Sequence, residues 1–345
     1  MFLKEKDTAE MPAHVALLEK LFMPFMFQAI YVAADLHLAD HLKDGAKSIG
    51  ELAQVTQTDE SALYRLLRSL TSMDIFKESE KGIFELTPMA EWLRSDVEGS
   101  LHSMALMLGG QPMWNLLPEL LTSIKTGESS FEKTFKQSFY EYLNQSENKK
   151  AGDIFNLAMS HNTQRQIKQI LTNYDFSSYH QIIDVAGNHG QLLTAILKEA
   201  SDSKGIIFDQ PYARELALAN LNKAQVSDRC EFVVGDFFKE ITKGGDLYIL
   251  KHILHNWNDE KVLEILTQCR EAMGDSSKLL VIDSVIEEGD SKDLAKFLDL
   301  QMLLLLGGKE RTQEEYSQLC EASGLFIHRA IKLPMSMSLL EIYPK

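Results

Sequence analysis

Residues 182–190 read Ile-Ile-Asp-Val-Ala-Gly-Asn-His-Gly, and this stretch decides the fold class of the 345-residue chain. The apolar run 182–185 predicts a buried strand, and a helix is expected to begin at Gln191. Gly187 and Gly190 lie in the loop between them, where the chain must turn sharply. The stretch therefore predicts a strand, a loop and a helix, with a loop that a ligand can approach closely.

The alternation of strands and helices continues beyond this loop. Apolar runs predict four further strands at residues 205–209, 231–234, 247–250 and 279–282, with helical segments between them. Such alternation implies right-handed crossovers and a parallel, doubly wound sheet. Ligands of such sheets bind at the carboxyl ends of the strands, so the residues after each strand are the candidates for a site.

Asp209 ends the second predicted strand, at the spacing from Gly190 at which a carboxylate binds ribose hydroxyls. This pattern indicates a nucleoside cofactor. A dinucleotide usually needs three glycines, so that its pyrophosphate reaches the helix N-terminus. Ala186 and Asn188 flank Gly187 here, which favours a ligand without phosphates. Asp209 alone does not distinguish this ligand from the cofactor of a nicotinamide-dependent dehydrogenase.

Side chains suited to chemistry follow the third and fourth strands. Asp236 and Phe237 combine a carboxylate with an aromatic ring, a pair that can hold an adenine. His252 and His255 follow the fourth strand. A phenolic hydroxyl has a pKa near ~10 and needs a base to become a good nucleophile, a task to which histidine is suited. His255 is the candidate base.

A catalytic histidine also needs a partner that fixes its tautomer. Asp283, at the end of the fifth strand, and Glu310, in the segment Gly-Gly-Lys-Glu-Arg-Thr at 307–312, are the candidates.

The N-terminal part of the chain predicts a winged helix. Ser48 and Glu51 form a capping-box pattern, a helix follows at 60–72, and two short strands flank Gly82. The second helix offers only Arg65 and Arg68 as cations. With a net charge of -15, the chain is expected to use this fold for packing or dimerisation and to bind no nucleic acid.

The bulk properties predict a cytoplasmic protein of two domains. The charged start at 1–7 does not resemble a secretory signal, and no membrane span is expected. Cys230, Cys269 and Cys320 show no disulfide or metal spacing and are expected to be buried, inert thiols.

These segments together resemble the plant and bacterial small-molecule O-methyltransferases of secondary metabolism, which include the caffeate and acetylserotonin (hydroxyindole) enzymes. The most specific matches are residues 208–211, 235–238, 250–257 and 307–312. The resemblance covers nearly the whole chain. It implies a Rossmann-like, doubly wound class I methyltransferase sheet with an N-terminal, mostly α winged-helix domain that forms a homodimer.

The resemblance also implies domain borders and partners. Residues 1–100 would form the dimerisation domain, 101–173 a helical connector lining the substrate pocket, and 174–345 the catalytic domain. Phe22, Phe25 and Met26 would contribute to the homodimer.

S-adenosylmethionine, converted to S-adenosylhomocysteine, would be the cofactor, and no metal is expected. By the resemblance, the cofactor-binding residues are Gly187, Asp209, Asp236, Phe237 and Lys251. His255 would be the base, flanked by Asp283 and Glu310. The substrate-binding residues would be Trp114, Phe155, Met159, Asn162, Asn256 and Met302.

Four positions depart from the family pattern. Asp283 stands where plant members carry Glu, and Asn256 stands where the family commonly has Asp. Ala186 and Asn188 replace glycines of the usual Asp-Val-Gly-Gly-Gly-x-Gly loop.

The implied reaction is an in-line transfer of the methyl group to a hydroxyl of a small aromatic molecule, as His255 removes the proton. One alternative is a relative that methylates nitrogen or carbon, or that is diverted to decarboxylation or hydroxylation. A ligand-sensing winged-helix regulator is an alternative from another class.

Overall fold

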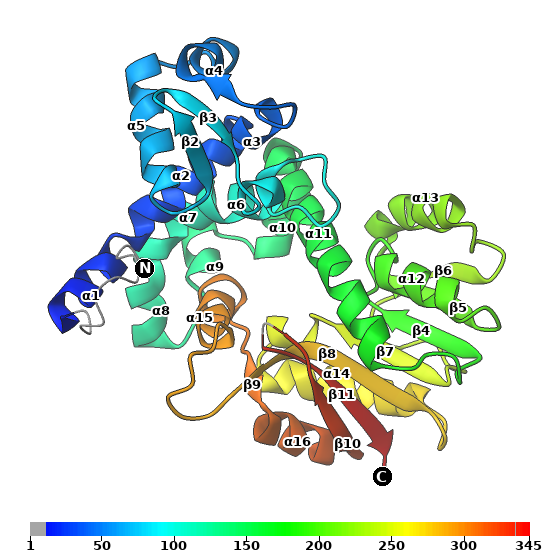
Figure 1. Cartoon of the computed structure of the whole chain (residues 1–345). Coiled ribbons are helices and arrows are strands. Elements are labelled where there is room, and N and C mark those ends of the chain that lie inside the picture. The colour runs from blue at the N-terminus through cyan, green and yellow to red at the C-terminus, as the bar shows by residue number, and fades with distance from the viewer. Residues whose placement is uncertain (1–11, 335) are drawn as a thin grey trace. The chain divides into compact units, whose positions relative to one another are not determined.

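The strand, loop and helix expected around residues 182–199 are present in the computed structural model, which describes residues 12–334 and 336–345 (Figure 1). The chain forms two compact units. The first unit contains Met1–Asn115 and Leu143–Asn162, and the second contains Leu116–Tyr142 and Thr163–Lys345. Residues 101–173 are thus shared between the two units, and the three-part division of the sequence stays a prediction.

The first unit contains the expected winged helix. Its helices include α1 (Ala13–Leu21), α2 (Met23–Asp35), α3 (Leu38–His41), α4 (Ile49–Thr56), α5 (Glu60–Thr71), α6 (His102–Gly109) and the first part of α11 (Lys149–Asn173). Strands β1 (Lys47–Ser48), β3 (Ile83–Leu86) and β2 (Phe76–Glu80) pair in that order as an antiparallel sheet. The capping box of Ser48 and Glu51 at the start of α4 is confirmed.

Leucines on one side of α5 form part of the core of the first unit. Leu63, Leu67 and Leu70 are buried and pack in one cluster with Phe76 of β2 and Phe84 of β3. The helical period of these leucines brings them onto one face of α5, which explains why α5 packs on the wing.

The second unit is built on an eight-stranded sheet. Its strands are β4 (Gln181–Val185), β5 (Lys204–Asp209), β6 (Cys230–Val234), β7 (Leu247–Lys251), β8 (Lys278–Ile286), β9 (Arg311–Thr312), β10 (Leu325–Lys332) and β11 (Met337–Pro344). The order is β10-β11-β8-β7-β4-β5-β6, with β9 paired to β8. All five expected strands are present and run parallel.

The sheet is mixed and not purely parallel as expected, because β11 runs antiparallel to both β8 and β10. The two C-terminal strands form a hairpin, and a hairpin reverses the chain direction without a crossover helix.

Helices cover both faces of this sheet. Ile182 and the helices α12 (Gln191–Glu199) and α13 (Arg214–Ala224) belong to one buried cluster. Ile183 and the helices α14 (Asp259–Ala272) and α16 (Gln313–Ala322) belong to another. Neighbouring residues of a strand point to opposite faces, so the doubly wound arrangement is confirmed. The carboxyl ends of β4, β5, β7 and β8 are therefore left for the site.

The three cysteines are free and buried, as expected. Burial raises the pKa of Cys230, Cys269 and Cys320 to about 12, so these thiols are protonated and inert at neutral pH.

One segment departs from the expectation that the chain holds no membrane span. The 23 residues Ala13–Asp35, which form α1 and α2, are long and apolar enough to cross a membrane by length and composition. The core helix of a soluble protein and a signal sequence can meet the same criteria of length and composition.

Candidate active site

The candidate base His255 lies just beyond the carboxyl end of β7, in the short helix η5 (Leu254–Asn256). Its Nδ1 donates a hydrogen bond to Oε1 of Glu310, 2.7 Å away. Glu310 is almost fully buried and immediately precedes β9. Because Nδ1 is engaged in this way, Nε2 is the nitrogen left to accept a proton from another molecule.

Asp283 lies on β8 close to both histidines and has no exposed surface. Its Oδ1 is 3.7 Å from Nδ1 of His255 and 3.4 Å from Nδ1 of His252. The structure therefore brings together His255, Asp283 and Glu310, the three residues that the sequence analysis selected. Of the two carboxylates, Glu310 makes the direct hydrogen bond.

His252 belongs to the same cluster, although the sequence analysis gave it no role. Its ring lies 5.3 Å from that of His255, and its Nε2 lies within 3.2 Å of the side-chain amide of Gln166 on α11. Burial lowers the pKa of His252 well below its usual value, and the charges of Lys251 and His255 lower it further. The spacing of two histidines three residues apart after a strand was the signal that could have identified it.

The electrostatics separate the two histidines. Burial by itself lowers the pKa of His255, but the charges of Asp283 and Glu310 outweigh it and raise this pKa above its ordinary value. Burial in turn raises the pKa of Glu310, against the hydrogen bond from His255. His255 is therefore the stronger base, and the carboxylates stabilise its protonated form.

The segment 308–311, which contains Glu310, also forms hydrogen bonds with the backbone around His255. The backbone N–H of Lys309 donates to the carbonyl oxygen of His255 at 2.9 Å. The fully buried guanidinium of Arg311 donates to the carbonyl oxygens of Leu254 at 3.2 Å and Trp257 at 2.8 Å. The position of the imidazole is thus set by backbone contacts on both sides of it.

Gly308 permits this close approach because it has no side chain. A Cβ at this position would lie 2.2 Å from the carbonyl oxygen of His255, far inside van der Waals contact. The N–H of Glu310 donates to Oδ1 of Asp299 on α15 (Ala295–Leu306), 2.9 Å away. Arg311, Gly308 and Asp299 were not predicted as site residues, although the segment 307–312 was singled out.

The loop after β4 lies against the end of β5. The backbone N–H of Asn188 donates to Oδ2 of Asp209 at 2.7 Å, and that of Gln210 donates to Oδ1 at 2.6 Å. Asp209 is buried, and burial raises its pKa against these two hydrogen bonds. A Cβ at Gly187 would lie 2.7 Å from the carboxylate of Asp184, so only glycine fits there.

Two residues of this loop stand where the family usually has glycine, and both adopt left-handed backbone conformations. Ala186 has φ +58° and Asn188 has φ +50°. Glycine takes this conformation without cost, asparagine tolerates it, and alanine is strained in it. Alanine at position 186 therefore strains the backbone, whereas the glycine usual in the family would not.

Lys251 ends β7 and is half-buried, close to the buried Asp184. Its Nζ donates to Oγ1 of Thr163 at 3.1 Å. Burial lowers the pKa of Lys251 to about 8, and burial raises the pKa of Asp184 to about 7, while the opposite charges of the two groups act against both shifts. Two neighbouring groups with pKa values shifted in this way are typical of a binding or catalytic site.

Asp236 and Phe237 follow β6. Asp236 accepts a hydrogen bond from the N–H of Phe238 at 3.1 Å and pairs with Lys239 at 3.1 Å. The ring of Phe237 packs at 4.7 Å from that of Phe238. These two residues, with Gly187, Asp209 and Lys251, place all five expected cofactor-binding residues in the second unit, at the carboxyl ends of its parallel strands.

The expected substrate-binding residues are divided between the units. Phe155, Met159 and Asn162 lie on successive turns of α11, and Trp114 lies in α7 (Met113–Leu116), all within the first unit. Asn256 and Met302 lie in the second unit, where the amide of Asn256 donates to the carbonyl oxygen of His252 at 3.1 Å. A shared role for all six stays a prediction.

A metal ion is also compatible with part of this site. His252, His255 and Asp283 each offer one ligand atom, and these atoms lie within 4.8 Å of one another. The expectation that the reaction needs no metal therefore stays a prediction.

Comparisons with known proteins cover nearly the whole chain. Residues 18–96 match the O-methyltransferase dimerisation domain, and residues 114–326 match the O-methyltransferase domain. A phenazine O-methyltransferase of Lysobacter antibioticus is 39% identical over 96% of this chain and 97% of the relative. An 8-amino-8-demethylriboflavin N,N-dimethyltransferase of Streptomyces davaonensis is 33% identical over 86% of both chains.

Solved structures of methyltransferases are also similar to this chain. The mitomycin 7-O-methyltransferase MmcR has a TM-score of 0.88 at 31% identity, over 96% of this chain and 98% of that one. The calicheamicin-biosynthesis methyltransferase CalO1, in a form with S-adenosylhomocysteine (SAH) bound, has a TM-score of 0.85 at 30% identity, over 98% and 100%. The present chain belongs to the O-methyltransferase family of S-adenosylmethionine-dependent enzymes.

Proposed function

We propose that this protein transfers a methyl group from S-adenosylmethionine to a hydroxyl of a small aromatic metabolite, with His255 as the general base. The observation that carries the proposal is the 2.7 Å hydrogen bond from Nδ1 of His255 to the buried carboxylate of Glu310. It holds the neutral imidazole in the tautomer whose Nε2 lone pair can take the proton of an acceptor.

The buried carboxylates stabilise His255 after it has taken that proton. When Nε2 is protonated, the imidazolium lies beside Glu310 and Asp283, whose charges raise the pKa of His255. General-base help of this kind contributes about 10²–10⁴-fold to a rate, and positioning and exclusion of water contribute further. S-adenosylmethionine supplies the methyl group on a positively charged sulfur, so the protein itself needs no nucleophile.

The loop after β4 fits this cofactor. Oδ1 of Asn188 is buried and has no hydrogen-bond partner within residues 12–334 and 336–345, so it is available to a ligand. Gly187, Asp209, Asp236, Phe237 and Lys251 would hold the cofactor. The loop lacks the third glycine of a dinucleotide site, which supports a ligand without phosphates.

The remaining parts of the proposal rest on the family. The acceptor would lie against Trp114, Phe155, Met159, Asn162, Asn256 and Met302. The dimerisation domain at 18–96 supports a homodimer. A cytoplasmic location, and the absence of nucleic-acid and membrane partners, complete the proposal.

Isothermal titration with S-adenosylmethionine, S-adenosylhomocysteine and NAD, repeated on Asp209→Ala, tests the cofactor. We expect tight binding of the first two, which the substitution abolishes. Binding of NAD alone would contradict the proposal and favour a dehydrogenase. Phenols are then screened for methylation by mass spectrometry.

Nitrogen is an alternative acceptor, because the Streptomyces davaonensis relative is named an N,N-dimethyltransferase. An uncharged amine has a free lone pair and needs no base before it attacks. If amines are methylated and His255→Ala leaves that rate nearly unchanged, the acceptor is nitrogen. A large loss of rate with phenols supports the proposed hydroxyl acceptor.

A further inference from the structure

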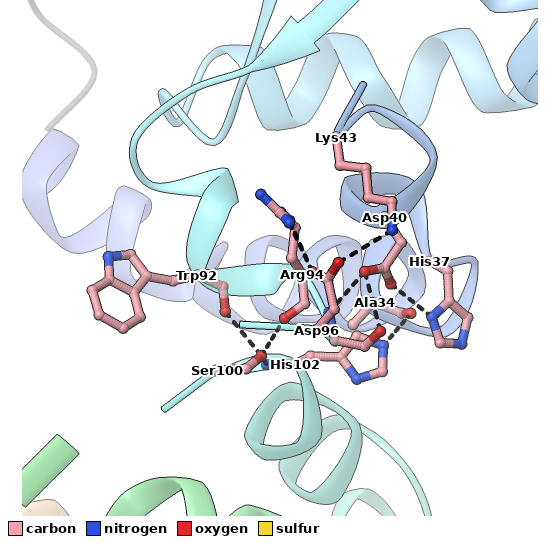
Figure 2. A network of polar contacts seen from close by, with 10 residues as sticks. Ala34, His37, Asp40, Lys43, Trp92, Arg94, Asp96, Ser100 and His102 are labelled. Carbon is pink, nitrogen blue, oxygen red and sulfur yellow. Dashed lines mark hydrogen bonds and ion pairs between the residues drawn. The ribbon is translucent and has the colours of Figure 1, made fainter. Parts of the chain in front are cut away.

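We propose that His37, Asp40 and His102 form a binding site for a divalent transition-metal ion in the first unit, separate from the residues of the candidate active site. His37 precedes α3, Asp40 lies in α3, and His102 begins α6. Each residue offers one ligand atom, and the three atoms lie within 4.8 Å of one another. Figure 2 shows the three side chains converging from the two segments.

Other groups already orient two of the three side chains. Oδ1 of Asp40 accepts hydrogen bonds from the backbone N–H of Ser95 at 2.8 Å and from its hydroxyl at 3.1 Å. Nε2 of His102 lies 3.0 Å from the carbonyl oxygen of Ala34 (Figure 2). Metal ligands in proteins are usually held by such outer contacts, which reduce the ordering needed when the ion binds.

His37 completes the cluster and leaves it accessible. Its backbone is left-handed, with φ +51°, and its Nδ1 lies 2.9 Å from Oδ2 of Asp40. Its ring centroid is 4.7 Å from that of His102. Its side chain is 51% exposed, whereas His102 is buried. The exposed ring can therefore move the short distance needed to close around an ion that enters from solvent.

The donor atoms of this cluster suit a cation of borderline-soft character. Two imidazoles and a carboxylate, with a water as fourth ligand, are a typical donor set for Zn²⁺.

The positive charge near the site is partly offset by acidic residues. The ammonium of Lys43 lies 3.2 Å from Oδ2 of Asp96, and the guanidinium of Arg94 lies 2.9 Å from Oδ1 of the same residue (Figure 2). Asp96 therefore compensates part of their positive charge. Asp35 adds a further negative charge that acts on His102.

A bound ion would join the segment between α2 and α3 to the start of α6. These elements are otherwise linked here by hydrogen bonds and packing. Because the three ligands come together only in the folded chain, binding of the ion would stabilise the first unit.

Zn²⁺ titration of the chelator-treated, full-length protein tests this proposal. The cluster of His252, His255 and Asp283 offers a second possible site, so the titration uses His255→Ala as the background. We expect one Zn²⁺ per chain by isothermal titration, and visible absorption bands of a low-coordinate ion when Co²⁺ replaces it.

Two substitutions and one control complete the experiment. His37→Ala removes an exposed ligand, and Asp40→Asn removes the charged one. Each should weaken Zn²⁺ binding at least tenfold and abolish the rise in melting temperature with Zn²⁺. His41→Ala, on the same helix but outside the cluster, should leave both unchanged. Absence of Zn²⁺ binding, or equal binding by His37→Ala and His41→Ala, would overturn the proposal.

Discussion

At the scale of single residues, the position of His255 beside two buried carboxylates predicts the pH dependence of catalysis. The base must be unprotonated, so kcat/KM should rise with pH through the pKa of His255 and then level off. The charges of Asp283 and Glu310 raise this pKa above its ordinary value, although burial by itself lowers it. Glu310→Gln keeps an acceptor for Nδ1–H but removes one charge, so the rise should move to lower pH and the plateau should fall.

A pH–rate profile of both proteins measures this shift. Glu260→Gln, an exposed position in the first turn of α14, is the matched control and should leave the profile unchanged. A profile that is the same for Glu310→Gln and for the unmodified protein would show that another group controls the rate.

Substitution of His255 itself separates chemistry from binding. His255→Ala should lower kcat by about 10²–10⁴-fold, the usual contribution of a general base, and leave the affinity for S-adenosylmethionine nearly unchanged. Turnover assays and isothermal titration give the two values. Loss of cofactor binding in this variant would make His255 a structural residue.

Ala186 predicts a change in stability and not in chemistry. Its left-handed backbone costs an alanine roughly 1 kcal/mol that glycine does not bear, so Ala186→Gly should raise the free energy of unfolding by up to that amount. Denaturant unfolding measures it. Ala219→Gly, in the exposed interior of α13, should instead destabilise by about 1 kcal/mol. Loss of stability in both variants would contradict the assigned strain.

At the scale of elements, the segment 308–311 should hold the helix η5, and with it His255, in position. A Cβ on Gly308 would displace the carbonyl oxygen of His255, so Gly308→Ala should lower kcat at least tenfold, with a smaller effect on KM for S-adenosylmethionine. Gly274→Ala is the control, because its Cβ would meet its nearest neighbour at an ordinary 3.6 Å. Unchanged turnover in Gly308→Ala would show that this contact does not position the base.

At the scale of the whole molecule, the apolar surface of α1 and α2 predicts the homodimer interface. Leu21 is 66% exposed and Phe25 is 74% exposed, in a region that matches the family's dimerisation domain. Apolar surface of this kind is typically covered by a partner. The double substitution Leu21→Glu and Phe25→Glu should raise the dimer dissociation constant at least a hundredfold.

Sedimentation analysis of the variant measures this change. Leu216→Glu, at an equally apolar position of α13 that is 53% exposed, should leave the dimer intact. The same α1–α2 segment meets the length and composition of a membrane span, so co-sedimentation with lipid vesicles is the parallel assay. Binding to vesicles by a monomeric protein would contradict the proposed dimer.

Much of the second unit follows from local sequence. Alternating apolar runs predict the five parallel strands, and the loop at 186–190 with Asp209 predicts a nucleoside site, because period and spacing are local properties. The antiparallel β11 was not expected, since a strand near the chain end can pair in either direction until the neighbouring strand is known.

The sequence by itself selected His255, Asp283 and Glu310, because each follows a predicted strand or lies in a distinctive motif. Only the tertiary structure decided that Glu310 makes the direct bond, that His252 shares Asp283, and that Arg311 holds the backbone around the base. The cluster of His37, Asp40 and His102 is another such case. The physical reason is the same throughout: residues far apart in the chain approach within hydrogen-bond distance only through packing, which no local pattern encodes.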